Sequence, residues 1–210
     1  FREQFLPALN FNASEHAIEA PAVFVGQGVH APELQHDDFA GLDLRGRIAV
    51  VFPGAPTRFD NDRRAFHSAT REKLRALAER GAIGVIFVNT PQDEASTPWS
   101  RGADNWQRSG MRLRGADGKG MHTFPELLAS ANVSAAAADL IFADGQQTAA
   151  ALFQAAQAGT LKRFALPGTI TLAARTKIEP AESRNVVAKL PGSDPALAAE
   201  HIVYTAHLDH

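Results

Sequence analysis

The sequences IAVVFPG at residues 48–54 and IGVIFVN at residues 83–89 decide the fold. Each is a continuous run of β-branched and other apolar residues, which is typical of a strand buried on both faces of a sheet. Between the two runs, Leu74 and Leu77 recur at helical spacing, and Gly81 provides the C-terminal stop of a helix. A strand, a helix and a strand in this order predict a right-handed βαβ unit with parallel strands.

The segment before this helix is polar. Residues 55–67 predict a loop, and the hydroxyl of Ser68 can accept bonds from free N–H groups, so we expect the helix to begin there. The acidic sequence DND at residues 60–62 hints at calcium, but the required Gly and Glu do not follow, and we expect a solvated loop. His67 and His122 are expected at the surface or as caps.

The flanking sequence adds further strands and helices. Strand patterns occur at residues 21–25, 127–133 and 169–174, and helix patterns at residues 134–142 and 148–158. Asp144-Gly145 and Gly159 are expected to end the two helices. Residues 90–122 are punctuated by Gly and Pro and predict a long irregular insertion. The expected fold class is therefore mixed α/β, built around the βαβ unit.

The composition narrows the function classes. The 210 residues have a formal net charge of −2, so we expect no nucleic-acid partner. No apolar run is long enough to span a bilayer, so we expect no membrane span. The absence of cysteine excludes disulfides and thiolate chemistry, and no Gly-x-Ser-x-Gly motif supports a serine hydrolase.

A domain boundary is predicted near the C-terminal end. Residues 175–184 are charged and contain Pro180, and new strand patterns follow at residues 185–190 and 202–206. The sequence starts at Phe1 and stops directly after a strand pattern, so we expect a piece of a longer polypeptide. The expected domains are a lead-in at residues 1–20, a main domain at 21–175 and the truncated start of a second domain at 185–210.

The last strand pattern leads into His207 and Asp209. Imidazole nitrogen suits zinc, and a carboxylate two residues away can accept the second N–H of the ring and orient it. A His-x-Asp spacing alone is also compatible with two solvated polar residues at a strand end.

The sequences SRNVVAKLPGS at 183–193 and EHIVYTAHLDH at 200–210 resemble the opening of the catalytic domain of zinc-dependent, two-metal aminopeptidases related to glutamate carboxypeptidase. The resemblance implies that His207 is a metal ligand and that Asp209 holds its ring. It also implies two zinc ions, a peptide substrate and a secreted or periplasmic location. The remaining ligands and the general base of that family have no counterpart in this sequence, so we expect the chain alone to be inactive.

The sequences PAVFVG at 21–26 and DDFAGLDLRGRIAVV at 37–51 resemble the protease-associated (PA) domain that many such peptidases carry. This resemblance extends over roughly residues 20–175, and it implies that the lead-in derives from the parent catalytic domain.

Two functions remain open. The chain is expected either to be the accessory part of an aminopeptidase that removes N-terminal residues, or to be a stand-alone interaction or substrate-gating module without catalysis. In the insertion at residues 90–122, basic side chains could contact a peptide carboxylate, or the loop could simply be solvated; they are Arg101, Arg108, Arg112 and Arg114.

Overall fold

The computed structural model describes residues 1–143 and 147–207, so the predicted helix end at Asp144-Gly145 and the predicted Asp209 lie outside the described residues. The contacts between residues divide the chain into two units, Phe1–Ile178 and Glu179–His210. Each unit is described by itself.

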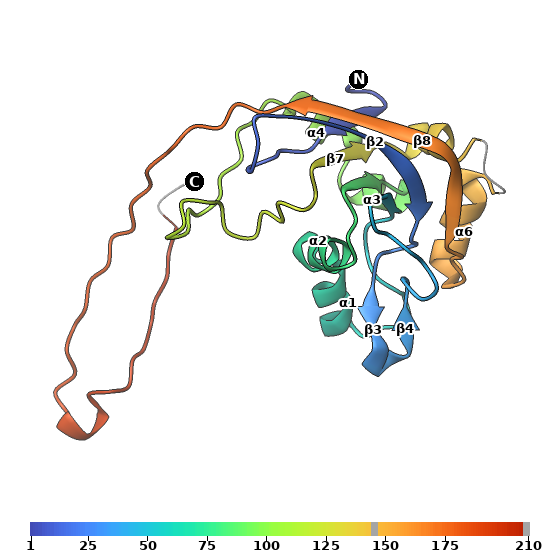
Figure 1. The fold of residues 1–210 in the computed structure, drawn as a ribbon. Coiled ribbons are helices and arrows are strands. Elements are labelled where there is room, and N and C mark those ends of the chain that lie inside the picture. Colours follow the sequence, from blue (N-terminus) through green and yellow to red (C-terminus); the bar gives the residue numbers. More distant parts are fainter. Residues whose placement is uncertain (144–146, 208–210) are drawn as a thin grey trace. The chain divides into compact units, whose positions relative to one another are not determined.

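The first unit is built on a six-stranded mixed sheet with the strand order β1-β7-β6-β5-β2-β8 (Figure 1). Its central strands run parallel to one another: β2 (Glu15–Phe24), β5 (Ile48–Val51), β6 (Gly84–Val88) and β7 (Ala129–Val133). The edge strands β1 (Phe5–Pro7) and β8 (Phe164–Arg175) are antiparallel to their neighbours. The mixed α/β class and the parallel β5–α2–β6 unit are thus confirmed.

Successive residues of the central strands point to opposite faces of the sheet. On one face, Ile48 and Val50 join a core cluster with Phe24 and Phe52, and all four are fully buried. On the other face, Ala49 and Val51 join a second cluster. Because both faces of the sheet are covered at β5 and β6, the positions of these two strands are apolar, which explains their continuous apolar runs.

Helices cover the two faces. α2 (Thr70–Glu79) buries Leu77 in the second cluster. α5 (Ala138–Phe142) and α6 (Ala149–Ala158) bury Phe142 and Leu152 in the first cluster. α6 matches its prediction: it begins after the cap Thr148 and ends at Gly159, which adopts φ 69°.

The predicted start of the central helix is wrong. Residues 61–68 form a separate helix, α1 (Asn61–Ser68), in place of the expected loop. Its N-cap is Asp60, whose carboxylate accepts the N–H of Arg63 at 3.0 Å, so the acidic stretch caps a helix. Ser68 ends this helix, and the extended residue Ala69 then separates it from α2.

The expected irregular insertion also contains helices. α3 (Pro91–Ser96) begins with a capping box between Thr90 and Asp93, and α4 (Trp99–Asp104) follows. The reciprocal Thr90–Asp93 bonds satisfy free backbone N–H groups, so six residues suffice to make a helix there. Within the expected insertion, residues 105–122 remain without helix or named strand.

Short elements complete the first unit. β3 (His30–Ala31) pairs with β4 (His36–Asp37) around the 3-10 turn η1 (Pro32–Leu34), and this hairpin packs on a small cluster that includes Val29 and Phe59. η2 (Ala135–Ala137) precedes α5. Its N-cap residue, Ser134, makes no capping bond, and its buried hydroxyl has no hydrogen-bond partner.

The second unit is extended over its described residues. It contains the turn η3 (Pro195–Leu197). The strands predicted at residues 185–190 and 202–206 are not formed, and their apolar side chains are exposed, for example Val186 at 86% and Tyr204 at 92%. A strand forms only when its backbone groups pair with neighbouring strands and its apolar side chains are buried. These two segments have no such neighbours among the described residues, so the predicted strands are absent there.

Residues 1–20 take part in the sheet of the first unit, through β1 and the first part of β2. The bounds of the lead-in, the main domain and the truncated second domain stay predictions. Among the described helices, none has the length and apolar character required to cross a membrane.

Candidate functional site

The predicted metal centre starts with His207 and Asp209. His207 lies in the second unit, and Asp209 lies outside the described residues. Within residues 1–143 and 147–207, no three His, Asp or Glu side chains lie close enough together to hold a metal ion. The described residues alone therefore do not build a zinc site, and the roles of His207 and Asp209 stay predictions.

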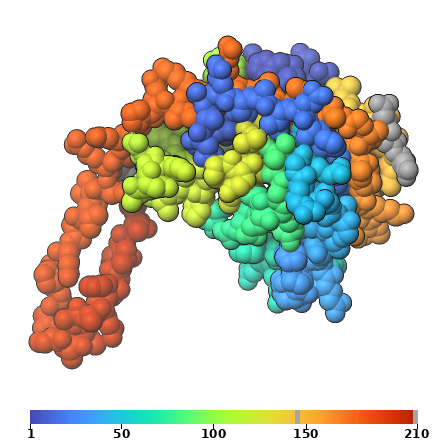
Figure 2. Space-filling view, viewed as in Figure 1, coloured from blue at the N-terminus to red at the C-terminus, as the bar shows by residue number. Residues whose placement is uncertain are grey.

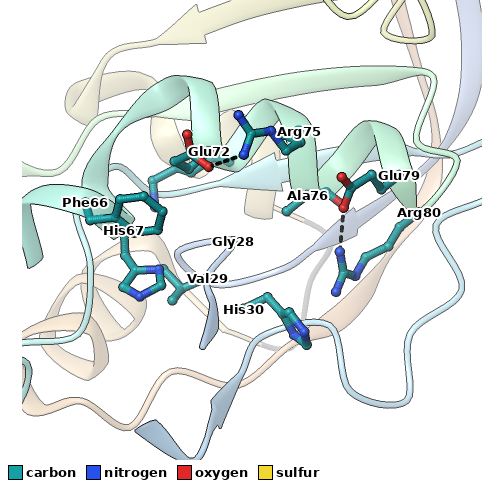
Figure 3. A pocket seen from close by; sticks show the side chains of 11 residues that line it. Gly28, Val29, His30, Phe66, His67, Glu72, Arg75, Ala76, Glu79 and Arg80 are labelled. Carbon is teal, nitrogen blue, oxygen red and sulfur yellow. Dashed lines mark hydrogen bonds and ion pairs between the residues drawn. The ribbon is translucent and has the colours of Figure 1, made fainter. Parts of the chain in front are cut away.

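A hollow of about 250 Å³ lies in the first unit, between the segment that enters β3 and the helices α1 and α2 (Figure 3). One wall is formed by Gly28, Val29 and His30, and the end of α1 contributes Phe66 and His67. The other wall is one face of α2, where side chains recur three and four residues apart: Glu72, Lys73, Arg75, Ala76, Glu79 and Arg80.

The charges of this wall are partly paired. Nη1 of Arg75 donates to Glu72 at 2.9 Å, while 43% of the Arg75 side chain stays exposed. Arg80 donates to the carbonyl of Ala76 at 2.9 Å, and its guanidinium lies 4.2 Å from the ring centroid of Phe39. Phe66 is 57% exposed. The hollow thus offers an apolar ring beside guanidinium groups with remaining donor capacity.

Lys73 lines the hollow, although only 2% of it is exposed. Its side-chain nitrogen donates to the carbonyl oxygens of Gln27 and Gly54, at 2.5 and 2.6 Å. Burial lowers the pKa of Lys73 to about 8, although the negative charges of Asp38 and Asp93 act in the opposite direction. The ammonium group joins the two loops that follow β2 and β5.

A buried carboxylate stands on the same side of the unit. Asp38 is 4% exposed, and one of its oxygens accepts the N–H of Val29 at 3.0 Å. Its other oxygen lies 3.1 Å from Nε2 of His36.

Burial lowers the pKa of His67, and nearby Lys73 adds to this effect, whereas Glu33 opposes it. His67 is therefore mostly neutral at pH 7, and its side chain is only 10% exposed, contrary to the predicted surface position.

A second hollow, of about 490 Å³, lies at the carboxyl ends of the central strands. Half of its lining residues carry amide or hydroxyl side chains, Arg64 and Asp93 are its charged members, and Phe153 contributes apolar surface. The carboxyl edge of parallel strands is where open α/β sheets commonly bind ligands. Gln27 and Gly54, which hold Lys73, border this hollow.

Sequence reasoning missed Lys73 as a buried residue. The signal was available, because Lys73 precedes Leu77 by four residues and so shares the buried face of α2. No sequence pattern indicates that Asp38 is buried, since its burial accompanies tertiary contacts with Val29 and His36.

Two comparisons with known proteins found similarity. A family model described as "PA domain" matches residues 18–141. Among solved structures, an aminopeptidase from Aneurinibacillus sp. strain AM-1 is similar, with a TM-score of 0.32 and 20% identity. The match covers 78% of this chain but only 28% of that aminopeptidase, so this chain spans less than a third of its length. No curated protein matches the sequence.

The family match covers more than half of the 210 residues and includes both stretches on which the protease-associated resemblance was based. It also includes the βαβ unit and the lining of the 250 Å³ hollow. The chain belongs to the PA domain family.

Proposed function

We propose that this chain is the accessory, peptide-binding part of a zinc metallo-aminopeptidase that removes N-terminal residues from peptides. The observation that carries the proposal is the PA domain match over residues 18–141. The sequence after this domain supports the peptidase assignment, because residues 183–193 and 200–210 resemble the start of a two-metal catalytic domain.

The 250 Å³ hollow is the place where we expect peptide to bind. Its exposed Phe66 offers an apolar contact, and Arg75 offers guanidinium donors for a carboxylate or a main-chain carbonyl. Its charged groups are held by neighbours in the same unit, as the Glu72–Arg75 pair shows, so little ordering is needed on binding. The site binds and positions peptide and does no chemistry itself.

The second unit is the place where we expect catalysis to begin in a longer protein. Its apolar stretches, such as Val186-Val187 and Ile202-Val203, are exposed and would be buried by further strands of a catalytic sheet. His207 would then supply an imidazole to zinc, and Asp209 would orient that ring. The zinc ions would activate water for peptide hydrolysis.

The catalytic part of the proposal is tested in two steps. The chain of 210 residues, with zinc added, should not hydrolyse an aminoacyl-p-nitroanilide. Turnover that survives purification and disappears in His207→Ala would contradict this expectation. In the longer protein, His207→Ala should remove activity and bound zinc, measured by metal analysis, whereas His201→Ala should change neither.

The binding part is tested with the chain as it is. A fluorescent peptide should bind, and Phe66→Ala or Arg75→Ala should weaken binding about tenfold, by loss of an apolar or a charged contact. Lys162→Ala, at an exposed position outside the hollow, is the matched control. Equal affinity of all variants would place peptide binding elsewhere.

A stand-alone interaction or substrate-gating module is the second candidate. The specific observation in its favour is that the first unit has its own sheet with core clusters on both faces. Under this alternative, the natural protein binds peptide through Phe66 and Arg75 and holds no zinc. His207→Ala then leaves its peptide affinity unchanged.

A further inference from the structure

Residues 111–121 form a small hairpin whose turn is closed by backbone bonds. Arg114 and Gly120 are bridge partners, the N–H of Met121 donates to Leu113 at 2.8 Å, and the N–H of Gly115 donates to Lys119 at 2.8 Å. Leu113 and Met121 are therefore opposite neighbours, with side chains on the same face of the hairpin.

The hairpin is fastened to the first unit on its arginine side. The guanidinium of Arg112 lies 4.5 Å from the ring centroid of Phe11. Beyond the hairpin, the Thr123 hydroxyl donates to the side-chain oxygen of Asn12 at 2.6 Å, and the Asn12 amide donates to the Thr123 carbonyl at 3.0 Å. These contacts fix the orientation in which the hairpin presents its other side.

That other side carries large apolar side chains in contact with water. Met111 is 73% exposed, Leu113 is 74% exposed and Met121 is 43% exposed. The segment lies at the surface of the first unit, in yellow-green in Figure 2. Apolar side chains that are held together on an ordered backbone and left exposed are a feature of interaction surfaces. Methionine in particular adapts to varied apolar partners.

Basic residues are frequent in the sequence that carries these apolar residues. Residues 105–123 contain four basic side chains and a single acidic one, Asp117. Arg112 and Arg114 are engaged with Phe11 and with the carbonyl of Gly118, while Arg108 and Lys119 are exposed. An occupant of this surface must therefore combine apolar side chains with negative charge.

We propose that Met111, Leu113 and Met121, flanked by Arg108 and Lys119, form a docking surface for an acidic, apolar segment of a protein partner. We call these five residues the hairpin surface. The surface is separate from the 250 Å³ hollow and goes beyond the function proposed for it. A protein segment is favoured over an anionic bilayer because two of the four basic groups are already engaged, whereas polybasic membrane sites need several free cations.

The proposal is tested by fluorescence polarisation with the full chain and labelled peptides of about eight residues. One peptide alternates Glu and Leu, and the comparison peptides alternate Lys and Leu or Ser and Leu. We expect the Glu–Leu peptide to bind at least about tenfold more tightly than either, with an affinity that falls as salt rises. The triple variant Met111→Ser/Leu113→Ser/Met121→Ser and the double variant Arg108→Glu/Lys119→Glu should each weaken binding about tenfold or more.

Matched controls separate this surface from the rest of the chain. Leu140→Ser changes another exposed apolar residue, 67% exposed on α5, and Lys162→Glu changes another exposed cation. Neither should affect binding of the Glu–Leu peptide. Circular dichroism and thermal unfolding should show that all variants fold.

Several outcomes would overturn the proposal. Equal binding of the three peptides, or full affinity in the two hairpin variants, would remove the hairpin surface as an acidic docking site. Binding of phosphatidylserine vesicles without binding of the Glu–Leu peptide would assign the surface to membranes. Loss of Glu–Leu binding in Phe66→Ala with full affinity in the hairpin variants would leave the proposed function intact and refute this inference alone.

Discussion

The side-chain nitrogen of Lys73 lies 2.6 Å from the carbonyl oxygen of Gly54, although the lysine comes from α2 and the glycine from the loop after β5. The same nitrogen also binds the carbonyl of Gln27, which follows β2. One buried ammonium group therefore ties together the loops at the carboxyl ends of two parallel strands. The loop after β2 borders both hollows, since Gly28 lines the 250 Å³ hollow and Gln27 lines the 490 Å³ hollow, which Gly54 also lines.

Replacement of Lys73 by methionine should destabilise the fold. The variant fills the same space but leaves two carbonyl oxygens without their donor, so the free energy of unfolding at pH 7 should fall by about 2 kcal/mol. Chemical denaturation measures the change, with Lys162→Met as an exposed control. A variant as stable as the parent would mean that removing the cost of burying the ammonium offsets the two lost bonds.

The stability contributed at Lys73 should depend on pH. Burial lowers the pKa of Lys73 from 10.5 to about 8 in the folded state, so between these values the unfolded chain binds more protons than the folded chain. The free energy of unfolding of the parent relative to Lys73→Met should therefore rise as pH increases from about 8 to about 10.5, by up to roughly 3 kcal/mol. Below pH 8 the difference should be constant. Urea unfolding of both proteins at pH 7, 8.5 and 10 tests this, and a difference that falls with pH would contradict the direction.

Truncation of Leu152 should reveal the contribution of α6 to the core. Leu152 is fully buried against the sheet, and Leu152→Ala should lower the free energy of unfolding by about 3 kcal/mol, through lost burial and a residual cavity. Leu140→Ala, at a leucine that is 67% exposed on α5, should change it by less than about 0.5 kcal/mol. Similar losses in the two variants would mean that α6 does not pack as described.

The N-cap of α6 should contribute measurably to the free energy of unfolding. The Thr148 hydroxyl accepts the N–H of Ala151 at 3.3 Å, and Thr148→Ala should cost about 1 kcal/mol of stability. Thr148→Ser keeps the accepting oxygen and should retain most of that stability. If serine and alanine destabilise the chain equally, the capping bond is not the source of the effect. Thermal unfolding of the three proteins makes the comparison.

The central part of the fold was predictable because it is encoded locally. The apolar runs at residues 48–52 and 83–89 became β5 and β6, since strands covered on both faces need unbroken apolar sequence. Thr148 and Gly159 bounded α6, because caps act within one turn of a helix.

Local signals were less reliable where two interpretations compete. Ser68 has the chemistry of an N-cap, yet it ends α1, and the cap of that helix is Asp60. The capping box of Thr90 and Asp93 was hidden in a stretch rich in breaking residues. At residues 185–190 and 202–206 the strand pattern is present, but strands require partners that these segments do not meet among the described residues.

The sequence by itself determined the α/β class, the parallel βαβ unit, the resemblance to the protease-associated domain and the ends of α6, because periodicity and capping depend on neighbours in the chain. Only the tertiary structure decided that Lys73 joins Gln27 to Gly54, that Asp38 is buried and accepts the N–H of Val29, and that Met111, Leu113 and Met121 are exposed on one small hairpin. The Lys73 contacts join residues that are distant in the chain. The burial of Asp38 and the exposure of the three apolar residues depend on which other residues pack over them. Burial and pairing across the fold, which no local pattern records, therefore determine them.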